Sequence, residues 1–235
     1  MRIRLCQDAA ELARTAAGLM IDEIRRKPDL LLCAATGGSP EGAYAELTSR
    51  RDQFPQDRLR ILKLDEWGGL APDDPRTCGY YLQTRLLDPL NISPDRFFGF
   101  DSQPADPAAE AARVQALIER EGPIDVCVLG IGLNGHIAMN EPADSLQAGC
   151  HVAALSESTL AHPMLHGAGP LPAYGLTTGM ANLFQSRHVL LLISGAHKRE
   201  ITRRLLERRI STGLPASLLW MHPAVTCLID QEAAG

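Results

Sequence analysis

The sequence has little of what marks membrane, secreted or nucleic-acid-binding proteins. No apolar run approaches the roughly 20 residues of a membrane-spanning helix, and charged residues at the amino terminus interrupt any signal peptide. The 23 Lys and Arg residues form no basic block and are outnumbered by 28 Asp and Glu, which gives a formal net charge of −5. Two tryptophans and five phenylalanines are too few to suggest stacking on bases. We therefore expect a small-molecule partner in the cytoplasm, with neither nucleic acid nor a membrane involved.

Signatures of metal and nucleophilic chemistry are also lacking. The six cysteines form no C-x-x-C pair, and three of them lie in apolar strand-like runs, where a reduced thiol packs as a small hydrophobe. His162 and His166 have the spacing of a metal pair, but Pro163 lies between them and no glutamate accompanies them. No serine lies in a G-x-S-x-G elbow. We therefore expect reduced thiols and no metal site.

What the sequence does contain is an alternation of short β-like runs with helical patterns. This alternation predicts an α/β fold with a doubly wound, mostly parallel Rossmann-like sheet and helices on both faces. The 235 residues fit one large domain, 1–235, and show no repeat or convincing linker. Strands are predicted at 30–35, 59–64, 124–129, 189–194 and 225–230, and helices at 9–26, from 41, at 80–87, 108–120, 176–184 and 198–209.

The loop Gly130–Pro142 carries the strongest functional signal. It follows the apolar run 124–129, which is typical of a buried strand ending at the carboxyl edge of the sheet, where α/β folds place ligands. The proline that ends the loop favours extended backbone at Glu141 and allows this carboxylate to fold back on His136. A carboxylate bonded to one imidazole nitrogen leaves the other free to move protons. With Asn134 beside them, we interpret His136 and Glu141 as an acid-base pair rather than as structural residues.

A second motif, Thr36-Gly37-Gly38-Ser39, separates a predicted strand from a predicted helix. Adjacent glycines let the backbone approach an anion, and the helix start offers unpaired N–H groups at the positive end of its dipole. A phosphate fits there, and an ordinary tight turn explains the motif equally well. Lys198, just past another strand, could add a positive charge, although a solvated lysine is the commoner case.

Two adjacent carboxylates, Asp65 and Glu66, follow the predicted strand 59–64. Strand alternation points them in opposite directions, so only one is expected to face a ligand, and we choose Asp65. A carboxylate at a partly desolvated rim can reach the pKa that a general base needs, and such proton transfer contributes about 10²–10⁴-fold to a rate. The alternative is a helix cap or loop salt bridge, the commoner role of an Asp-Glu pair.

Together these segments resemble the glucosamine-6-phosphate deaminase/isomerase family. The resemblance covers nearly the whole chain and rests on the order and spacing of 35–40, 64–67, 130–142 and 194–198. Within the family, the segments 63–67, 162–165 and 211–220 look most similar to the galactosamine-6-phosphate deaminase/isomerase branch.

The resemblance implies a cofactor-free conversion of galactosamine 6-phosphate to tagatose 6-phosphate and ammonia; the alternative substrate is glucosamine 6-phosphate, with fructose 6-phosphate as product. His136, positioned by Glu141, resembles the family's ring-opening group. Asp65 matches the base that moves a proton from C2 to C1. The phosphate is expected on the residues that match the family's binding positions, namely Gly37, Gly38, Ser39 and Lys198, with Thr36 beside them.

Some positions depart from the family pattern. Many members carry an aspartate where this chain has Asn134, which cannot take a proton at neutral pH and is therefore expected to hydrogen-bond. The arginine that binds phosphate in many members has no clear counterpart, and His162 or His166 is the candidate substitute. The effector positions of regulated members fall on His151 and Ala153, so we expect no allosteric activation.

Two alternatives remain open. The related 6-phosphogluconolactonases share a Gly-His loop, but the continuation Asn140-Glu141-Pro142 and the segment 65–67 resemble the deaminases instead. A catalytically silent sugar-phosphate sensor could use the same scaffold, but the chain lacks an attached helix-turn-helix segment and keeps the candidate catalytic side chains. The oligomeric state, monomer or homo-oligomer, is left undecided.

Overall fold

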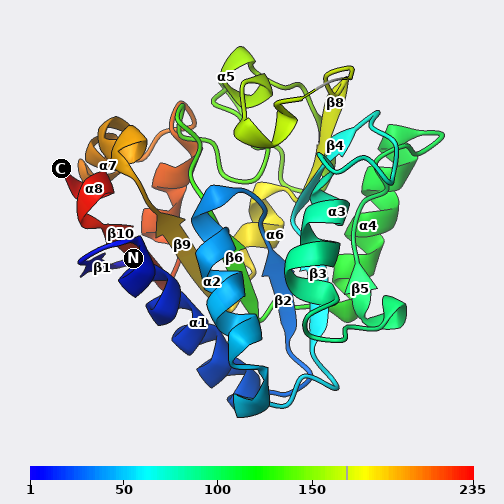
Figure 1. Ribbon diagram of the computed structural model, residues 1–235. Coiled ribbons are helices and arrows are strands. Elements are labelled where there is room, and N and C mark those ends of the chain that lie inside the picture. Colours follow the sequence, from blue (N-terminus) through cyan, green and yellow to red (C-terminus); the bar gives the residue numbers. More distant parts are fainter. Residues whose placement is uncertain (168) are drawn as a thin grey trace.

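Seven parallel strands form a sheet across the computed structural model, which describes residues 1–167 and 169–235 (Figure 1). The spatial order is β1-β10-β9-β6-β2-β3-β5, so the chain winds outward from β2 in both directions. The predicted fold class is confirmed. The strands are β1 (Arg2–Cys6), β2 (Leu31–Ala34), β3 (Arg60–Lys63), β5 (Phe97–Phe98), β6 (Val126–Leu129), β9 (His188–Ile193) and β10 (Val225–Asp230).

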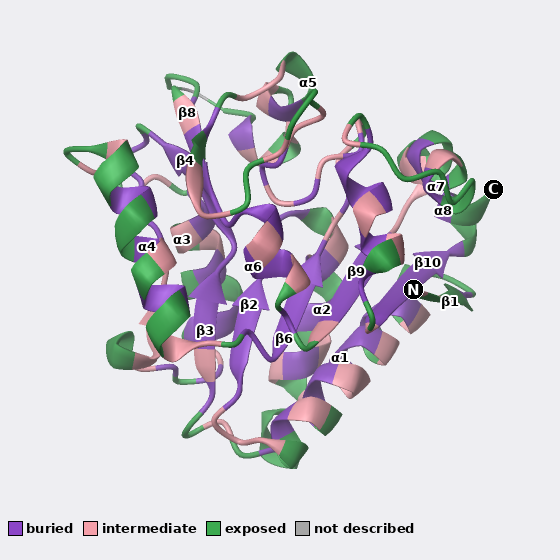
Figure 2. Cartoon of the chain, turned by 180° about the vertical axis from the view of Figure 1, so that it is seen from behind, coloured by how far each residue is buried: buried purple, intermediate pink, exposed green. Residues whose placement is uncertain are grey.

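Helices cover both faces of this sheet, because alternate strand residues point to opposite sides and both sides are apolar. Leu32 of β2 packs in the core beneath α1 and α2, whereas its neighbour Cys33 packs in the core beneath α4 and α7. Figure 2 shows the buried strands between helices whose outer faces are exposed. The helices are α1 (Ala9–Arg26), α2 (Gly38–Ser49), α3 (Cys78–Leu82), α4 (Pro107–Glu121), α5 (Glu157–Leu160), α6 (Met180–Phe184), α7 (Arg199–Leu206) and α8 (Gln231–Ala234).

A second, smaller sheet was not predicted. It is antiparallel, with the order β4 (Asp65–Gly68), β8 (Tyr174–Thr177) and β7 (His151–Ala153). The predicted helix at 176–184 is therefore wrong in its first part, because residues up to Thr177 pair with two other strands and only Met180–Phe184 is helical. A short apolar run has no decisive period of its own, and strand partners distant in sequence settled its structure.

All six cysteines are free and five of them are buried. In the described part of the chain, no helix combines the length and the apolar character needed to cross a bilayer.

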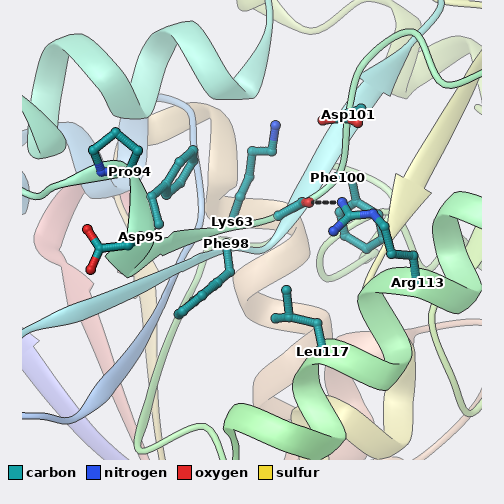
Figure 3. Close-up of a pocket in the computed structure, with 10 residues that line it drawn as sticks. Lys63, Pro94, Asp95, Phe98, Phe100, Asp101, Arg113 and Leu117 are labelled. Carbon is teal, nitrogen blue, oxygen red and sulfur yellow. Dashed lines mark hydrogen bonds between the residues drawn. The ribbon is translucent and has the colours of Figure 1, made fainter.

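A cavity of about 340 Å³ lies at the β5 edge of the large sheet (Figure 3). Its lining includes Lys63, Phe98, Asp101 and Arg113. The Arg113 guanidinium donates to the Gly99 carbonyl across 2.6 Å and also pairs with a neighbouring glutamate, so its charge is already satisfied. This cavity therefore offers little to a ligand, and the candidate chemistry lies elsewhere.

Candidate active site

The candidate site lies where the winding of the large sheet reverses, at the carboxyl ends of β2 and β6. Doubly wound folds bind ligands at such a switch point, because the loops leaving the two strands diverge and open a crevice. The loop after β2 carries Thr36–Ser39, and the loop after β6 carries residues 130–142. The two loops touch: a Cβ built on Gly130 would lie 4.0 Å from the Cβ of Ser39.

The Thr36–Ser39 loop is shaped for an anion. Gly37 has a φ of +99°, a left-handed conformation that L side chains disfavour. Helix α2 begins at Gly38, three residues earlier than predicted, so Gly38 and Ser39 lie in its first turn, where backbone N–H groups lack helical partners. The hydroxyl of Tyr81 donates to the Gly37 carbonyl across 2.9 Å and holds the loop in place.

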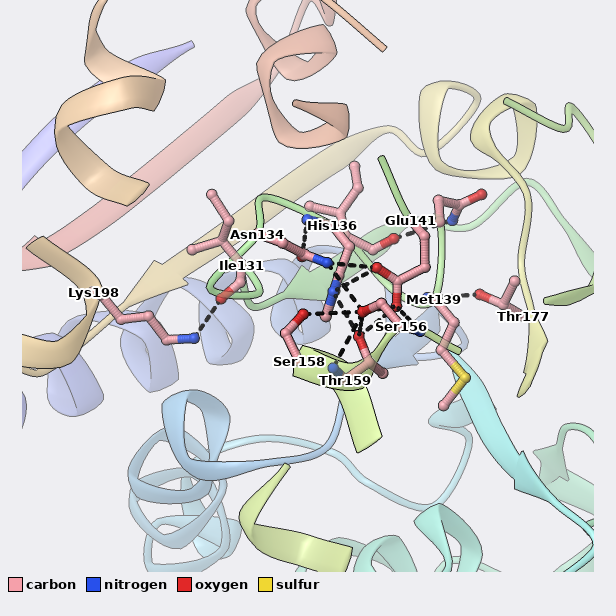
Figure 4. A network of polar contacts seen from close by, with 12 residues as sticks. Ile131, Asn134, His136, Met139, Glu141, Ser156, Ser158, Thr159, Thr177 and Lys198 are labelled. Carbon is pink, nitrogen blue, oxygen red and sulfur yellow. Dashed lines mark hydrogen bonds and ion pairs between the residues drawn. The ribbon is translucent and has the colours of Figure 1, made fainter. Parts of the chain in front are cut away.

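His136 and Glu141 are brought together as predicted, with 3.5 Å between His136 Nδ1 and Glu141 Oε2 (Figure 4). Asn134 links them, because its Nδ2 donates to Glu141 Oε2 across 2.6 Å and its Oδ1 accepts from the His136 backbone N–H. The imidazole lies so close to Gly132 that a Cβ there would collide with it. The loop glycine is therefore needed for the position of the ring.

Ser156 and Thr159 complete this network and were missed in the sequence. Both hydroxyls donate to Glu141 Oε1, and Thr159 Oγ1 also lies 3.3 Å from His136 Nδ1. Ser156 caps α5 by accepting from the Thr159 backbone N–H. The only signal in the sequence for these two residues was therefore a serine at a helix start with a threonine three positions later. That signal indicates a helix end and does not indicate a partner for Glu141.

These contacts fix the ionisation of Glu141 and the tautomer of His136. Burial alone would raise the pKa of Glu141, but the hydrogen bonds from His136, Thr159 and Asn134 outweigh it and lower that pKa to about 2. A carboxylate that is ionised at neutral pH accepts a hydrogen bond from Nδ1–H of the imidazole. His136 Nε2 is then the nitrogen left to exchange protons with a ligand.

Asp65 begins β4 and is buried, as is its neighbour Glu66. Glu66 Oε2 accepts from Lys63 Nζ at 2.5 Å and from the Gly79 backbone N–H at 2.8 Å, so this carboxylate anchors α3 to the sheet. Burial and then the charge of Glu66 raise the pKa of Asp65 to about 7, against smaller lowering effects of Cys78 and Lys63. The two carboxylates therefore have different surroundings, as alternation predicts, and Asp65 has the pKa of a base that works near neutral pH.

Strand β8 ties Asp65 to the histidine loop. Thr177 is the strand partner of Asp65, and its hydroxyl accepts from the backbone N–H of Met139 across 3.1 Å. Asn140 donates to the carbonyl of Thr178 across 3.0 Å. The unpredicted second sheet therefore brings the carboxylate of residue 65 and the loop of residue 136 to one place.

Lys198 and His162 approach the same loops from two further segments. Lys198 Nζ donates to the Ile131 carbonyl across 2.6 Å, and burial lowers its pKa. His162 precedes a short 3₁₀ turn, Pro163–Leu165, and its ring lies against Gly37, where a built Cβ would be 3.3 Å from Nε2. Burial, followed by the charges of Lys198 and His136, lowers the pKa of His162 to about 4. The ring is therefore neutral at pH 7.

The tautomer of His162 follows from its Nδ1, which accepts from the Met164 backbone N–H across 3.2 Å. The proton therefore sits on Nε2, the nitrogen nearest the glycine loop. His166, the other histidine of this segment, is exposed. Within the ranges 1–167 and 169–235, no group of three or more His, Cys, Asp or Glu side chains is arranged to hold a metal ion.

Comparison with known proteins gives consistent matches along the chain. The family model described as glucosamine-6-phosphate isomerases/6-phosphogluconolactonase matches residues 6–227. "Putative deaminase AgaI" of Escherichia coli (strain K12) is 39% identical over 93% of this chain and 88% of the relative. Glucosamine-6-phosphate deaminase 1 of Bacillus subtilis (strain 168) is 38% identical over 100% of this chain and 98% of the relative.

The solved structures give the same picture. A monomeric glucosamine-6-phosphate deaminase superposes with a TM-score of 0.93 at 38% identity, covering 100% of this chain and 99% of that one. A 6-phosphogluconolactonase from Trypanosoma cruzi superposes with a TM-score of 0.80 at 20% identity, covering 99% of this chain and 95% of that one. At 20% identity, the similarity to the lactonase shows only that the two chains share a fold.

Proposed function

We propose that this chain, which belongs to the glucosamine-6-phosphate isomerase/6-phosphogluconolactonase family, is a glucosamine-6-phosphate deaminase that yields fructose 6-phosphate and ammonia. The observation that carries the proposal is the convergence of Asp65, the His136–Glu141 pair and the Thr36–Ser39 loop at one end of the sheet. The names of the relatives favour glucosamine 6-phosphate over the galactosamine 6-phosphate expected from the branch-like segments.

The first step is ring opening, for which a proton must move from the anomeric hydroxyl to the ring oxygen. His136 Nε2 accepts this proton and returns it, while Glu141 and Thr159 hold Nδ1. Glu141 balances the imidazolium that forms in between. The product of this step is the open-chain aldehyde, with a carbonyl at C1 and the amine at C2.

Asp65 then takes the C2 proton and returns it to C1. The electrons of the C2–H bond form the C1=C2 bond of an enolamine, and the carbonyl oxygen at C1 takes a proton from solvent. Reprotonation of C1 by Asp65 gives an iminium ion at C2, which returns one proton to solvent and leaves the imine. Water adds to this imine and expels ammonia, giving the ketose. Because its pKa is about 7, Asp65 is basic enough to accept the proton and acidic enough to return it.

The 6-phosphate is held away from these bond changes. The N–H groups of Gly38 and Ser39 bind it at the start of α2, with Lys198 supplying charge and His162 Nε2–H supplying a further donor. Binding energy gained at this remote group fixes the orientation of the reacting end. In this proposal His162 provides the contact to phosphate that an arginine provides in many members of the family.

The test is to incubate the protein separately with glucosamine 6-phosphate, galactosamine 6-phosphate and 6-phosphogluconolactone, and to measure ammonia and acid release. We expect the fastest ammonia release from glucosamine 6-phosphate. Faster release from galactosamine 6-phosphate would overturn the choice of sugar and keep the reaction. Lactone hydrolysis without ammonia from either sugar would identify a lactonase, and inactivity on all three would favour the sensor.

A further inference from the structure

Cys78 lies beside the candidate base and has no part in the function proposed so far. It is the first residue of α3 and is completely buried. Its Sγ lies 3.7 Å from Asp65 Oδ1 on one side and 3.3 Å from Thr36 Oγ1 on the other. The thiol therefore connects the carboxylate to the loop that precedes α2.

The direction of the two hydrogen bonds follows from the available protons. Burial, followed by the charges of Glu66 and Asp65, raises the pKa of Cys78 well above its ordinary value, so the group is a neutral thiol. The hydroxyl of Thr36 donates its one proton to the sulfur, and the S–H in turn donates to Asp65. The Thr36 hydroxyl is thus engaged with Cys78, which leaves the backbone of the loop to serve an anion.

We propose that Cys78 is a positioning residue for the base: its thiol holds Asp65 Oδ1 and favours the ionised carboxylate, while Thr36 fixes the direction of the S–H. The second oxygen, Oδ2, has no hydrogen-bond partner within the described residues and is the one that takes the substrate proton. The proposal rests on the role of Asp65 in the proposed function. It also makes the orientation of the base depend on the loop proposed to bind phosphate.

None of the other groups described near Asp65 can stabilise its ionised carboxylate as the Cys78 thiol does. Glu66 on the same strand disfavours the charged form, and the favourable charge of Lys63 at the end of β3 is bound to Glu66 at 2.5 Å. Cys33 on β2 and Tyr44 on α2 are neutral, because burial raises the pKa of both. The facing residue on β8, Thr177, is uncharged. The thiol is therefore the one donor bonded to the Asp65 side chain in the described structure.

The test compares the acid limb of the pH profile of kcat/KM for ammonia release in wild type, Cys78→Ala, Cys78→Ser and Thr36→Val. Removing the thiol is expected to move this limb upward by about half a pH unit or more, since a hydrogen bond to the charged form is lost. Cys78→Ser keeps a donor and should hold the limb at or below the wild-type position. Thr36→Val should move it in the same direction as Cys78→Ala, by less.

Cys227→Ala is the matched control, because it makes the same substitution at another fully buried cysteine, on β10. An unmoved limb in Cys78→Ala, or equal shifts in Cys78→Ala and Cys227→Ala, would overturn the proposal. If Cys78→Ala does not fold, Cys78→Ser and Thr36→Val decide it. If the wild type releases no ammonia, the proposed function fails, and a ¹³C NMR titration of the Asp65 carboxyl in the same variants then decides the inference without substrate.

Discussion

The side-chain amide of Asn134 donates to the Glu141 carboxylate across 2.6 Å, and its oxygen accepts from the backbone N–H of His136. One residue thereby orients both members of the proposed acid-base pair without itself titrating. Asparagine suits this position because it offers a donor and an acceptor at once, whereas an aspartate would place a second negative charge against Glu141.

Replacing Asn134 by alanine should lower kcat roughly 10- to 100-fold, because a hydrogen bond to a charged group is lost and Glu141 is less firmly held. KM should change little, since the side chain of Asn134 bonds to Glu141, Ser156 and His136 and to none of the residues proposed to bind phosphate. Steady-state kinetics of ammonia release check this. A variant with unchanged kcat would show that the orientation of Glu141 does not depend on the amide.

The rate should rise with pH through neutrality, because Asp65 must be ionised to accept the C2 proton and its pKa is about 7. We expect the acid limb of kcat/KM to have its midpoint near pH 7. A profile that stays flat down to pH 5 would remove Asp65 as the base. The expectation is checked by rates of ammonia release in buffers of constant ionic strength.

Asp65→Asn should make the protein more stable in alkaline solution. The pKa of Asp65 is raised from 3.8 to about 7 in the folded protein, so its favourable contribution is complete below pH 3.8 and is lost as pH rises through 7. At pH 8 the buried charge destabilises the fold, and asparagine removes it. We expect the Tm of the variant to exceed that of wild type by several degrees at pH 8 and not at pH 4.

Asp74→Asn is the control of opposite sign. The hydrogen bonds from Arg76 lower the pKa of Asp74, so its ionised form stabilises the folded state and the variant should lose stability at pH 8. Calorimetric unfolding at pH 4 and pH 8 measures both variants. Equal Tm changes at the two pH values would contradict the raised pKa of Asp65.

His162→Ala should weaken binding of the phosphorylated substrate. The variant loses the Nε2–H donor beside Gly37, so KM for glucosamine 6-phosphate should rise about tenfold, with a smaller effect on kcat. Inhibition by inorganic phosphate should weaken in parallel. His166→Ala, which changes the exposed histidine of the same segment, is the matched control and should leave both quantities unchanged. Equal effects of the two substitutions would contradict the role of His162.

The sequence predicts the elements that carry a strong period of their own. The bounds of α1 and β10 agree with the predicted 9–26 and 225–230, because apolar residues recur every three to four positions in one and dominate the other, a short β-branched run. The strand at 174–177 was not predicted, since it is defined by its pairing with residues 65–68 and 151–153. Local pattern contains no information about such partners.

The residues of the candidate site also fall into those that the local sequence predicts and those that depend on distant partners. Asp65, His136 and Glu141 could be chosen because they follow predicted strands and carry side chains with obvious acid-base chemistry. Ser156 and Cys78 could not, because their contribution depends on partners 15 and 13 positions away along the chain. A serine at a helix start and a cysteine in a short helix have unremarkable roles in most sequences, and only their contacts distinguish them here.

The most direct test of the account is to separate the two proton transfers that it assigns to His136 and Asp65. Exchange between the α and β anomers of glucosamine 6-phosphate, followed by saturation-transfer NMR, reports ring opening, and ammonia reports the later steps. Asp65→Asn is predicted to accelerate anomer exchange as wild type does while ammonia release falls about 10²–10⁴-fold, and His136→Gln is predicted to lose both. An Asp65→Asn variant that still releases ammonia, or a His136→Gln variant that still opens the ring at the wild-type rate, would contradict the account.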